Sequence, residues 1–321
     1  MVAGFLVLLL AGLCQGSFGL GYKKYPPFTW AAFWGVYCLL CIVVSAGVTW
    51  ILAPGLWQVI ASQEGGYWFL PLFCGALWGL SAIGFSKGIS MIGMSMVYGI
   101  SMGISTVVGS VLPMVVNRAF PQGSSLLAFL AELVLTVIGV VLVTIAGVRR
   151  DGGAGKAKFG VVLAVFSGLG SGAMNLGFSY SQRISDAFTA LGYSQTAVSA
   201  GKWLSVLVGG CLAGALWCAG EMTKRREWKT LTEKGAAKRT GVLFGVSLIW
   251  YAALLLYGLS VSMLGNIGST VGWILFNALA LVISVGWGLK SGEWKDGGKN
   301  RQLLFAGCGV LILSWIFTVM V

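Results

Sequence analysis

Ten long apolar runs, separated by short polar junctions, make up almost the whole chain. The runs cover residues 2–21, 28–53, 67–89, 93–116, 125–148, 158–181, 195–220, 240–262, 267–289 and 302–321. About 20 helical residues cross the hydrocarbon core of a bilayer, which is about 30 Å thick. Transmembrane strands would alternate polar and apolar residues over segments of about ten, and the runs do not. The pattern predicts an all-α integral membrane protein with ten transmembrane helices.

Lysine and arginine gather at alternate junctions. Of the 21 basic residues, 18 lie at the junctions after the first, third, fifth, seventh and ninth runs. They are Lys23, Lys24, Lys87, Arg149, Arg150, Lys156, Lys158, Lys224, Arg225, Arg226, Lys229, Lys234, Lys238, Arg239, Lys290, Lys295, Lys299 and Arg301. Because cytoplasmic loops carry an excess of Lys and Arg, we expect these junctions in the cytoplasm and both termini in the periplasm.

Composition excludes several classes of protein. Only 9% of the residues are charged, against about 25% in soluble domains, so neither a soluble domain nor a nucleic-acid partner is expected. The chain has no His, and its seven Cys are scattered, so we predict no metal and no other cofactor. No two carboxylates share a run, which leaves little for acid–base catalysis. We do not expect an enzyme.

Two ordered echoes indicate an internal repeat. A shift of 156 positions aligns residues of the first run with residues of the sixth, namely Gly12/Gly168, Gly16/Gly172, Leu20/Leu176 and Gly21/Gly177. A shift of 172 positions aligns Trp78 with Trp250. Because each half holds five runs, the second half enters the membrane from the opposite side. The sequence therefore predicts an inverted repeat of residues 1–150 and 151–321, a build common in secondary transporters.

Two ionisable residues lie well inside the runs, where charge is costly and usually functional. Glu132 and Lys202 each come about seven residues into a run that enters from the periplasmic side, or about 11 Å deep. They could pair with each other or line a cavity open to that side. Lys202 could instead extend its side chain to the interface. Glu132 is the in-run carboxylate predicted to bind a coupling proton.

Neutral polar and aromatic residues near the middle of the runs form the candidate substrate site. Such side chains offer hydrogen bonds to sugar hydroxyls and flat faces to sugar C–H groups. Trp and Tyr also form belts at membrane interfaces, a role that suits Trp78 and Trp250 poorly because each lies near the centre of its run. These two rings could line a cavity or pack against neighbouring helices. The predicted substrate-binding residues are Gln15, Trp78, Tyr98, Asn175, Lys202, Trp250, Tyr251 and Trp273.

Several stretches resemble the L-rhamnose–proton symporter family of the drug/metabolite transporter superfamily. They are Ala76-Leu77-Trp78-Gly79, Gly93-Met94-Ser95-Met96, Gly160-Val161-Val162-Leu163-Ala164-Val165, Ala190-Leu191-Gly192, Trp250-Tyr251 with Tyr257, Trp273 and Glu293-Trp294. The resemblance covers essentially the whole chain. It implies ten helices in a five-plus-five inverted repeat, a central cavity, and uptake of a deoxysugar driven by protons.

The chain departs from the family pattern in its eighth and ninth runs. Family members carry Gln, His and Asp there, whereas this chain has no acidic residue between Glu233 and Glu293. Lys202 also replaces the small neutral polar residue that the family pattern has at this position. These departures concern proton coupling and sugar specificity, and leave the carrier architecture intact.

The sequence as a whole predicts a multi-pass inner-membrane carrier, monomeric or homodimeric, whose partners are a small sugar, the lipid bilayer and a proton. L-rhamnose or a related sugar is the expected substrate. One alternative is an exporter or exchanger of metabolites or drugs, as elsewhere in the superfamily. Another is a membrane sensor or scaffold that transports nothing.

Overall fold

The computed structural model describes residues 2–23, 25–62, 66–92, 94–118, 120–150, 157–265, 268–292, 294–295 and 298–318. Within these ranges the chain forms twelve α-helices, two short 3₁₀ helices and no strand. The helices are α1 Val2–Ser17, η1 Phe18–Lys23, α2 Trp30–Leu52, α3 Leu56–Ser62, α4 Gly66–Ile92, α5 Met94–Asn117, α6 Ser124–Arg150, α7 Ala157–Tyr180, α8 Gln182–Ala190, α9 Gln195–Arg225, η2 Trp228–Thr232, α10 Ala236–Leu264, α11 Gly268–Lys290 and α12 Gly298–Thr318. The prediction of an all-helical fold is confirmed.

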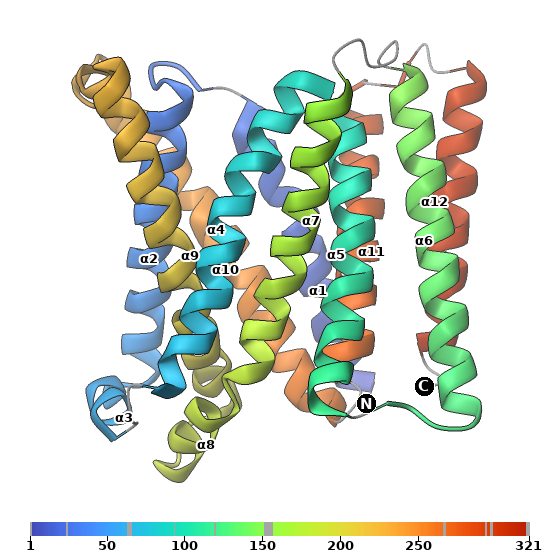
Figure 1. The fold of residues 1–321 in the computed structure, drawn as a ribbon, viewed down its shortest axis with the longest axis horizontal. Helices are drawn as coiled ribbons and strands as arrows, with labels where there is room; N and C mark the ends of the chain where they lie inside the picture. Colours follow the sequence, from blue (N-terminus) through green and yellow to red (C-terminus); the bar gives the residue numbers. More distant parts are fainter. Residues whose placement is uncertain are drawn as a thin grey trace.

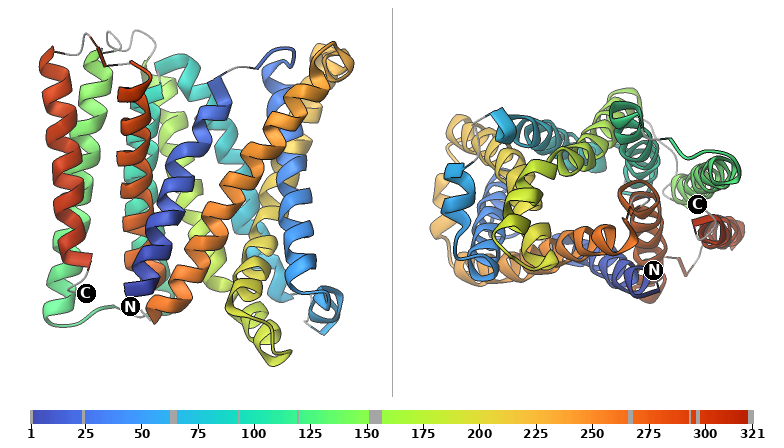
Figure 2. Two further views of the ribbon diagram at one scale, coloured as in Figure 1. Left: turned by 180° about the vertical axis from the view of Figure 1, so that it is seen from behind. Right: turned by 90° about the horizontal axis from the view of Figure 1, so that it is seen from below.

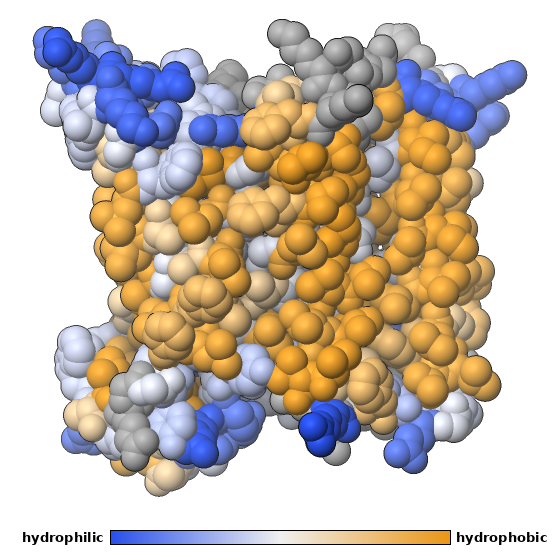
Figure 3. All heavy atoms as spheres, in the orientation of Figure 1, coloured by the Kyte–Doolittle hydropathy of each residue, from blue (hydrophilic) through white to orange (hydrophobic). Residues whose placement is uncertain are grey.

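Ten helical segments of the described chain are long and apolar enough to cross a membrane, as predicted. The first joins α1 to η1, and the sixth joins α7 to α8. Figure 3 shows the consequence at the surface, where apolar side chains form a belt between two polar edges. The short helices α3 and α8 were not predicted, and they lie at one of these edges (Figure 1).

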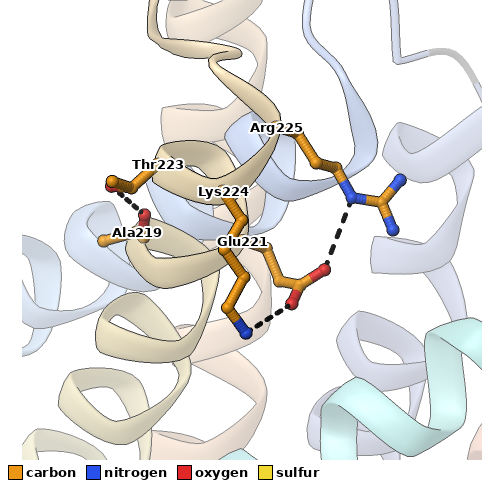
Figure 4. Close-up of polar contacts among 5 residues, drawn as sticks. All are labelled: Ala219, Glu221, Thr223, Lys224 and Arg225. Carbon is orange, nitrogen blue, oxygen red and sulfur yellow. Dashed lines mark hydrogen bonds and ion pairs between the residues drawn. The ribbon is translucent and has the colours of Figure 1, made fainter.

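The two edges of the belt carry different parts of the chain. Both chain ends lie at one edge, which we call the terminal face, and α6 and α9 end at the opposite edge, which we call the basic face (Figure 1). At the end of α9, Glu221 forms ion pairs with Lys224 and Arg225 at 3.6 and 3.4 Å (Figure 4). Because both basic side chains are largely exposed, these pairs contribute little stability and mark where α9 leaves the apolar belt.

The two halves of the chain interlock. Helix α1 packs against α10 and α11 of the second half, and α7 packs against α4 and α5 of the first. Two further pairs join the halves, α2 with α9 and α6 with α12. Figure 2 shows the α6–α12 pair at one end of the molecule and the other helices as a ring. The interior of this ring is where helices of both halves meet.

Glycines let α4 and α9 approach to backbone contact. A Cβ atom on Gly75 would overlap the carbonyl of Val206, and one on Gly79 would overlap the carbonyl of Gly210. Small residues four positions apart permit such approach in lipid, where apolar burial gives no net drive for helix pairing. The close contact fixes α4, and with it Trp78, against α9.

We therefore expect Gly79→Ala to lower the free energy of unfolding by about 1–3 kcal/mol or more, the range for overpacked sites. Gly47→Ala is the matched control, because a Cβ at Gly47 of α2 has no atom within 4 Å. Alanine there gains up to about 1 kcal/mol of helix propensity. Thermal unfolding of both variants in the same detergent is the measurement. Equal stability of the two variants would contradict the α4–α9 contact.

Candidate functional site

A central cavity of about 100 Å³ lies inside the ring of helices. Side chains from α1, α2, α4, α5, α7, α10 and α11 line it. Both halves of the chain therefore contribute to its wall. Of the predicted substrate-binding residues, those that line this cavity are Gln15, Trp78, Tyr98, Trp250 and Trp273.

An aromatic stack forms one wall of the central cavity. The rings of Trp78 and Trp250 are parallel to within 12°, with centroids 5.4 Å apart. Tyr37 packs against Trp250 with centroids 6.1 Å apart. The two Trp residues that the shift of 172 positions aligns in sequence are thus direct neighbours in space. Both rings line the cavity, one from α4 and the other from α10.

Hydrogen-bonding groups lie around the same cavity. The Gln15 Oε1 atom is buried and has no hydrogen-bond partner among the described residues. Ser101 and Ser167 share a hydrogen bond of 3.0 Å, and Asn277 donates from Nδ2 to the carbonyl of Trp273 at 3.0 Å. A buried acceptor without a partner costs free energy, so the side-chain carbonyl of Gln15 is suited to accept a hydrogen bond from a ligand hydroxyl.

Sequence reasoning missed part of this wall. Trp34 and Tyr37 line the cavity from α2, although no α2 residue was predicted to bind substrate. Their spacing of three residues places them on one face of the helix, so an aromatic pair at helical spacing in the second run was the available signal. Phe276 and Asn277 of α11 also line the cavity beside Trp273.

Asn175 and Tyr251 lie outside the lining of the central cavity. Asn175 of α7 donates from Nδ2 to the carbonyl of Gly109 in α5 at 2.8 Å, and the Tyr257 hydroxyl of α10 donates to Asn175 Oδ1 at 2.9 Å. We call these three residues the Asn175 cluster. It ties α5, α7 and α10 together on the terminal-face side of the cavity. Tyr251 lies against α2, with its hydroxyl 3.5 Å from Thr49 Oγ1.

The two ionisable candidates are far from each other. The Lys202 Nζ atom of α9 lies 4.1 Å from the centroid of Phe178, and Phe178 stacks on Trp203 with centroids 4.5 Å apart. Glu132 of α6 is fully buried. Figures 1 and 2 place α6 and α9 at opposite ends of the molecule. Glu132 and Lys202 therefore do not pair, and neither lines the central cavity.

Glu132 lies behind the cavity wall. Phe129 and Leu133, which flank it on α6, belong to one apolar cluster with Met114 of α5 and Ile274 of α11. The same two helices supply Tyr98 and Trp273 to the cavity. A change of charge at Glu132 would therefore act on helices that line the cavity.

A second cavity of about 120 Å³ adjoins the first on the basic-face side. The two cavities share the residues Gln15, Phe18, Tyr98 and Met102. Arg150 and Trp294 line its far end, and the Arg150 Cζ atom lies 4.5 Å from the Trp294 ring centroid. We call this space the basic-side cavity. The shared residues form the partition between it and the central cavity.

Comparison with known proteins gives the family. The sequence profile described as L-rhamnose-proton symport protein (RhaT) matches residues 1–320. The chain belongs to this family. The predicted resemblance is confirmed, although Gly93 and Glu293, which contributed to it, lie outside the described residues. As a member of this symporter family whose described residues form ten helices long and apolar enough to span a membrane, the chain is a multi-pass inner-membrane protein.

Relatives of the L-rhamnose-proton symport family match nearly the full chain. A protein of Yersinia pestis (strain Pestoides F) named L-rhamnose-proton symporter is 24% identical over 334 residues, covering 98% of this chain and 96% of its own length. A protein of the same name from Escherichia coli O1:K1 / APEC is 25% identical over 325 residues, covering 95% and 94%. One solved crystal structure has a TM-score of 0.60 and 14% identity, and covers 97% of this chain and 98% of its own. It shares the fold.

The Asn175 cluster makes a testable contribution to the stability of this family member. Tyr257→Phe removes the hydroxyl that donates to Asn175, and leaves a buried acceptor with one donor fewer. We expect the free energy of unfolding to fall by about 1–3 kcal/mol. Tyr180→Phe is the matched control, because no hydrogen bond of the Tyr180 hydroxyl occurs among the described residues. Thermal unfolding of the two variants is the measurement. Equal stability of the two would contradict the expectation.

Proposed function

We propose that this chain takes up L-rhamnose or a closely related sugar across the inner membrane together with a proton. The observation that carries the proposal is the central cavity, which is lined by both the Trp78–Trp250 stack and Gln15, whose side-chain carbonyl is buried without a hydrogen-bond partner among the described residues. Aromatic faces suit the C–H surface of a sugar, and the carbonyl suits a hydroxyl group. Membership of the symporter family and the names of its relatives support the same substrate class.

The proposed orientation has the basic face in the cytoplasm and both termini in the periplasm. Its support is the distribution of Lys and Arg, of which 18 of 21 lie at the junctions on one side. The positive-inside rule assigns such junctions to the cytoplasm. With this orientation the basic-side cavity leads from the central cavity toward the cytoplasm.

The proposed architecture is an inverted repeat of residues 1–150 and 151–321. The packing of α1 on α10 and α11 corresponds, repeat for repeat, to the packing of α7 on α4 and α5. Glycines at aligned positions make equivalent contacts, since a Cβ on Gly12 would meet Leu279 of α11 and one on Gly168 would meet Ile104 of α5. Such repeats transport by alternating access, in which one unit moves against the other around a central site.

We infer that this structure is the inward-facing state of the carrier, which is closed on the terminal-face side. The Asn175 cluster joins α5, α7 and α10 on the terminal-face side, and Trp273 donates from Nε1 to the Ser105 carbonyl at 3.0 Å nearby. The cavities extend toward the opposite face. Sugar would leave through the partition of Gln15, Phe18, Tyr98 and Met102. Separation of the Asn175 cluster would open the periplasmic side.

The remaining candidates receive roles that follow from their positions. Glu132 is the proposed proton-binding residue, because it is the fully buried carboxylate of the described chain and lies behind α5 and α11. Lys202, Asn175 and Tyr251 are proposed to meet substrate in the periplasm-open state. In that state Lys202 would lie beside the entry path, with Phe178 between Lys202 and the Asn175 cluster. The Phe178 ring contacts Lys202 Nζ and packs against Tyr257 with centroids 5.7 Å apart.

Thermal unfolding of the purified protein against a panel of sugars and amphipathic compounds tests the substrate class. We expect stabilisation by L-rhamnose that saturates with concentration, because a ligand bound only by the folded state raises its stability. Uptake into proteoliposomes with an imposed proton gradient tests transport. Stabilisation by amphipathic compounds alone would favour an exporter, and transport of neither class would favour a sensor or scaffold.

A further inference from the structure

An apolar groove of about 410 Å³ lies between α5 and α6, on the outside of the helix ring. Gly99, Gly103 and Val107 of α5 form one wall, and Val137 and Val141 of α6 belong to the other. Thr144 is the one polar side chain among the lining residues. Val141 is 48% exposed, so the groove is open to the bilayer rather than to the central cavity.

The groove occupies the half of the membrane nearest the basic face. Gly99 lies near the start of α5 and Ile145 near the end of α6, and both of these helix ends are at the basic face (Figure 1). From Ile145 to Val137 the helix rises about 12 Å. This length is close to one leaflet of a hydrocarbon core about 30 Å thick, so a single acyl chain from that leaflet matches the groove in length and polarity.

A positive charge stands at the mouth of the groove. Val137, Val141 and Ile145 recur at intervals of four residues on one face of α6, and the next position in this series is the exposed Arg149. Residues four apart on a helix lie one above the other, so the Arg149 guanidinium continues the groove toward the headgroup region. Lys299 and Arg301, both exposed, begin α12, which packs against α6.

We propose that this groove binds one anionic phospholipid of the leaflet at the basic face, with an acyl chain between α5 and α6 and its phosphate on Arg149. Basic groups between transmembrane helices on the cytoplasmic side bind acidic headgroups in this way. The site is separate from the central cavity, so the proposal stands whether or not the chain carries a sugar. The acyl chain would lie along the line where α5 and α6 meet, at which a Cβ on Gly99 would overlap Thr144.

The test compares lipids added to the delipidated full-length protein. Dioleoyl phosphatidylglycerol is expected to raise the unfolding temperature more than dioleoyl phosphatidylcholine, and native mass spectrometry is expected to retain one phosphatidylglycerol per chain. Glycerol 3-phosphate, which has the charge without the chains, is expected to have no effect. Equal shifts from the two phospholipids, or a full shift from glycerol 3-phosphate, would overturn the proposal.

Two variants locate the site. Val107→Trp fills the groove and is expected to abolish the difference between the two phospholipids, whereas Val115→Trp, on an exposed part of α5 outside the groove, should retain it. Arg149→Gln is expected to weaken phosphatidylglycerol binding about fivefold, because one basic residue near an anionic surface is worth about 1 kcal/mol. Lys238→Gln, on the exposed start of α10, is its control. If Val107→Trp does not fold, equal binding by Arg149→Gln and Lys238→Gln still excludes the site.

Discussion

Replacing Glu132 by Gln is expected to abolish proton-driven accumulation of sugar while leaving the exchange of sugar across the membrane intact. One proton carried across 100 mV gains about 2.3 kcal/mol, which can concentrate a neutral sugar about 50-fold. Gln keeps the size of the side chain but cannot take up or release a proton. The expected accumulation ratio in proteoliposomes therefore falls to about one.

Two measurements separate coupling from general damage to the protein. Counterflow of labelled sugar between equal concentrations needs no proton gradient, so it should proceed in Glu132→Gln at a rate close to the unchanged protein. Glu221→Gln is the control for the same substitution at the edge of the apolar belt, where Glu221 pairs with Lys224 and Arg225 (Figure 4). It should leave accumulation unchanged. Undiminished accumulation by Glu132→Gln would remove its proposed role, as would loss of counterflow together with accumulation.

The ten spans were predictable because each is a local property of the sequence. About 20 consecutive apolar residues are a strong signal in any position along the chain, and the described spans follow the predicted runs closely. The nine residues of α8 gave no such signal, since Gln182–Ala190 is too short and too polar to be recognised by hydropathy. Its amphipathic pattern is visible only to a search at helical periodicity.

The position of a residue along its helix was also predictable, but the direction in which its side chain faces was not. Glu132 and Lys202 lie at similar positions along their runs, and the structure places their helices at opposite ends of the molecule. Which helices pack together is a tertiary property that residue spacing within one run does not contain. Asn175 illustrates the same limit, because its amide meets Gly109 of α5 rather than the cavity. The sequence did relate Trp78 to Trp250, because a shift of 172 positions aligns the two residues.

Removal of either ring of the Trp78–Trp250 stack is expected to weaken sugar binding at least about tenfold, which corresponds to 1.4 kcal/mol. Trp78→Ala removes one flat face of the cavity and leaves Trp250 without its stacked partner. An aromatic pair contributes about 0.5–1.5 kcal/mol beyond its buried area. Loss of this contribution also leaves the remaining ring without the contact that fixes its orientation. Titration of L-rhamnose against tryptophan fluorescence or unfolding temperature gives the dissociation constant.

Three comparisons make this expectation specific to the stack. Trp57→Ala removes a ring of α3 that is 64% exposed and should leave sugar binding unchanged. Trp78→Phe keeps an aromatic face and should recover part of the affinity lost in Trp78→Ala. The double variant Trp78→Ala/Trp250→Ala should lose less than the sum of the two single losses, because residues in contact are coupled. Additive losses would mean that the two rings act separately, and unchanged affinity in Trp78→Ala would place the sugar elsewhere.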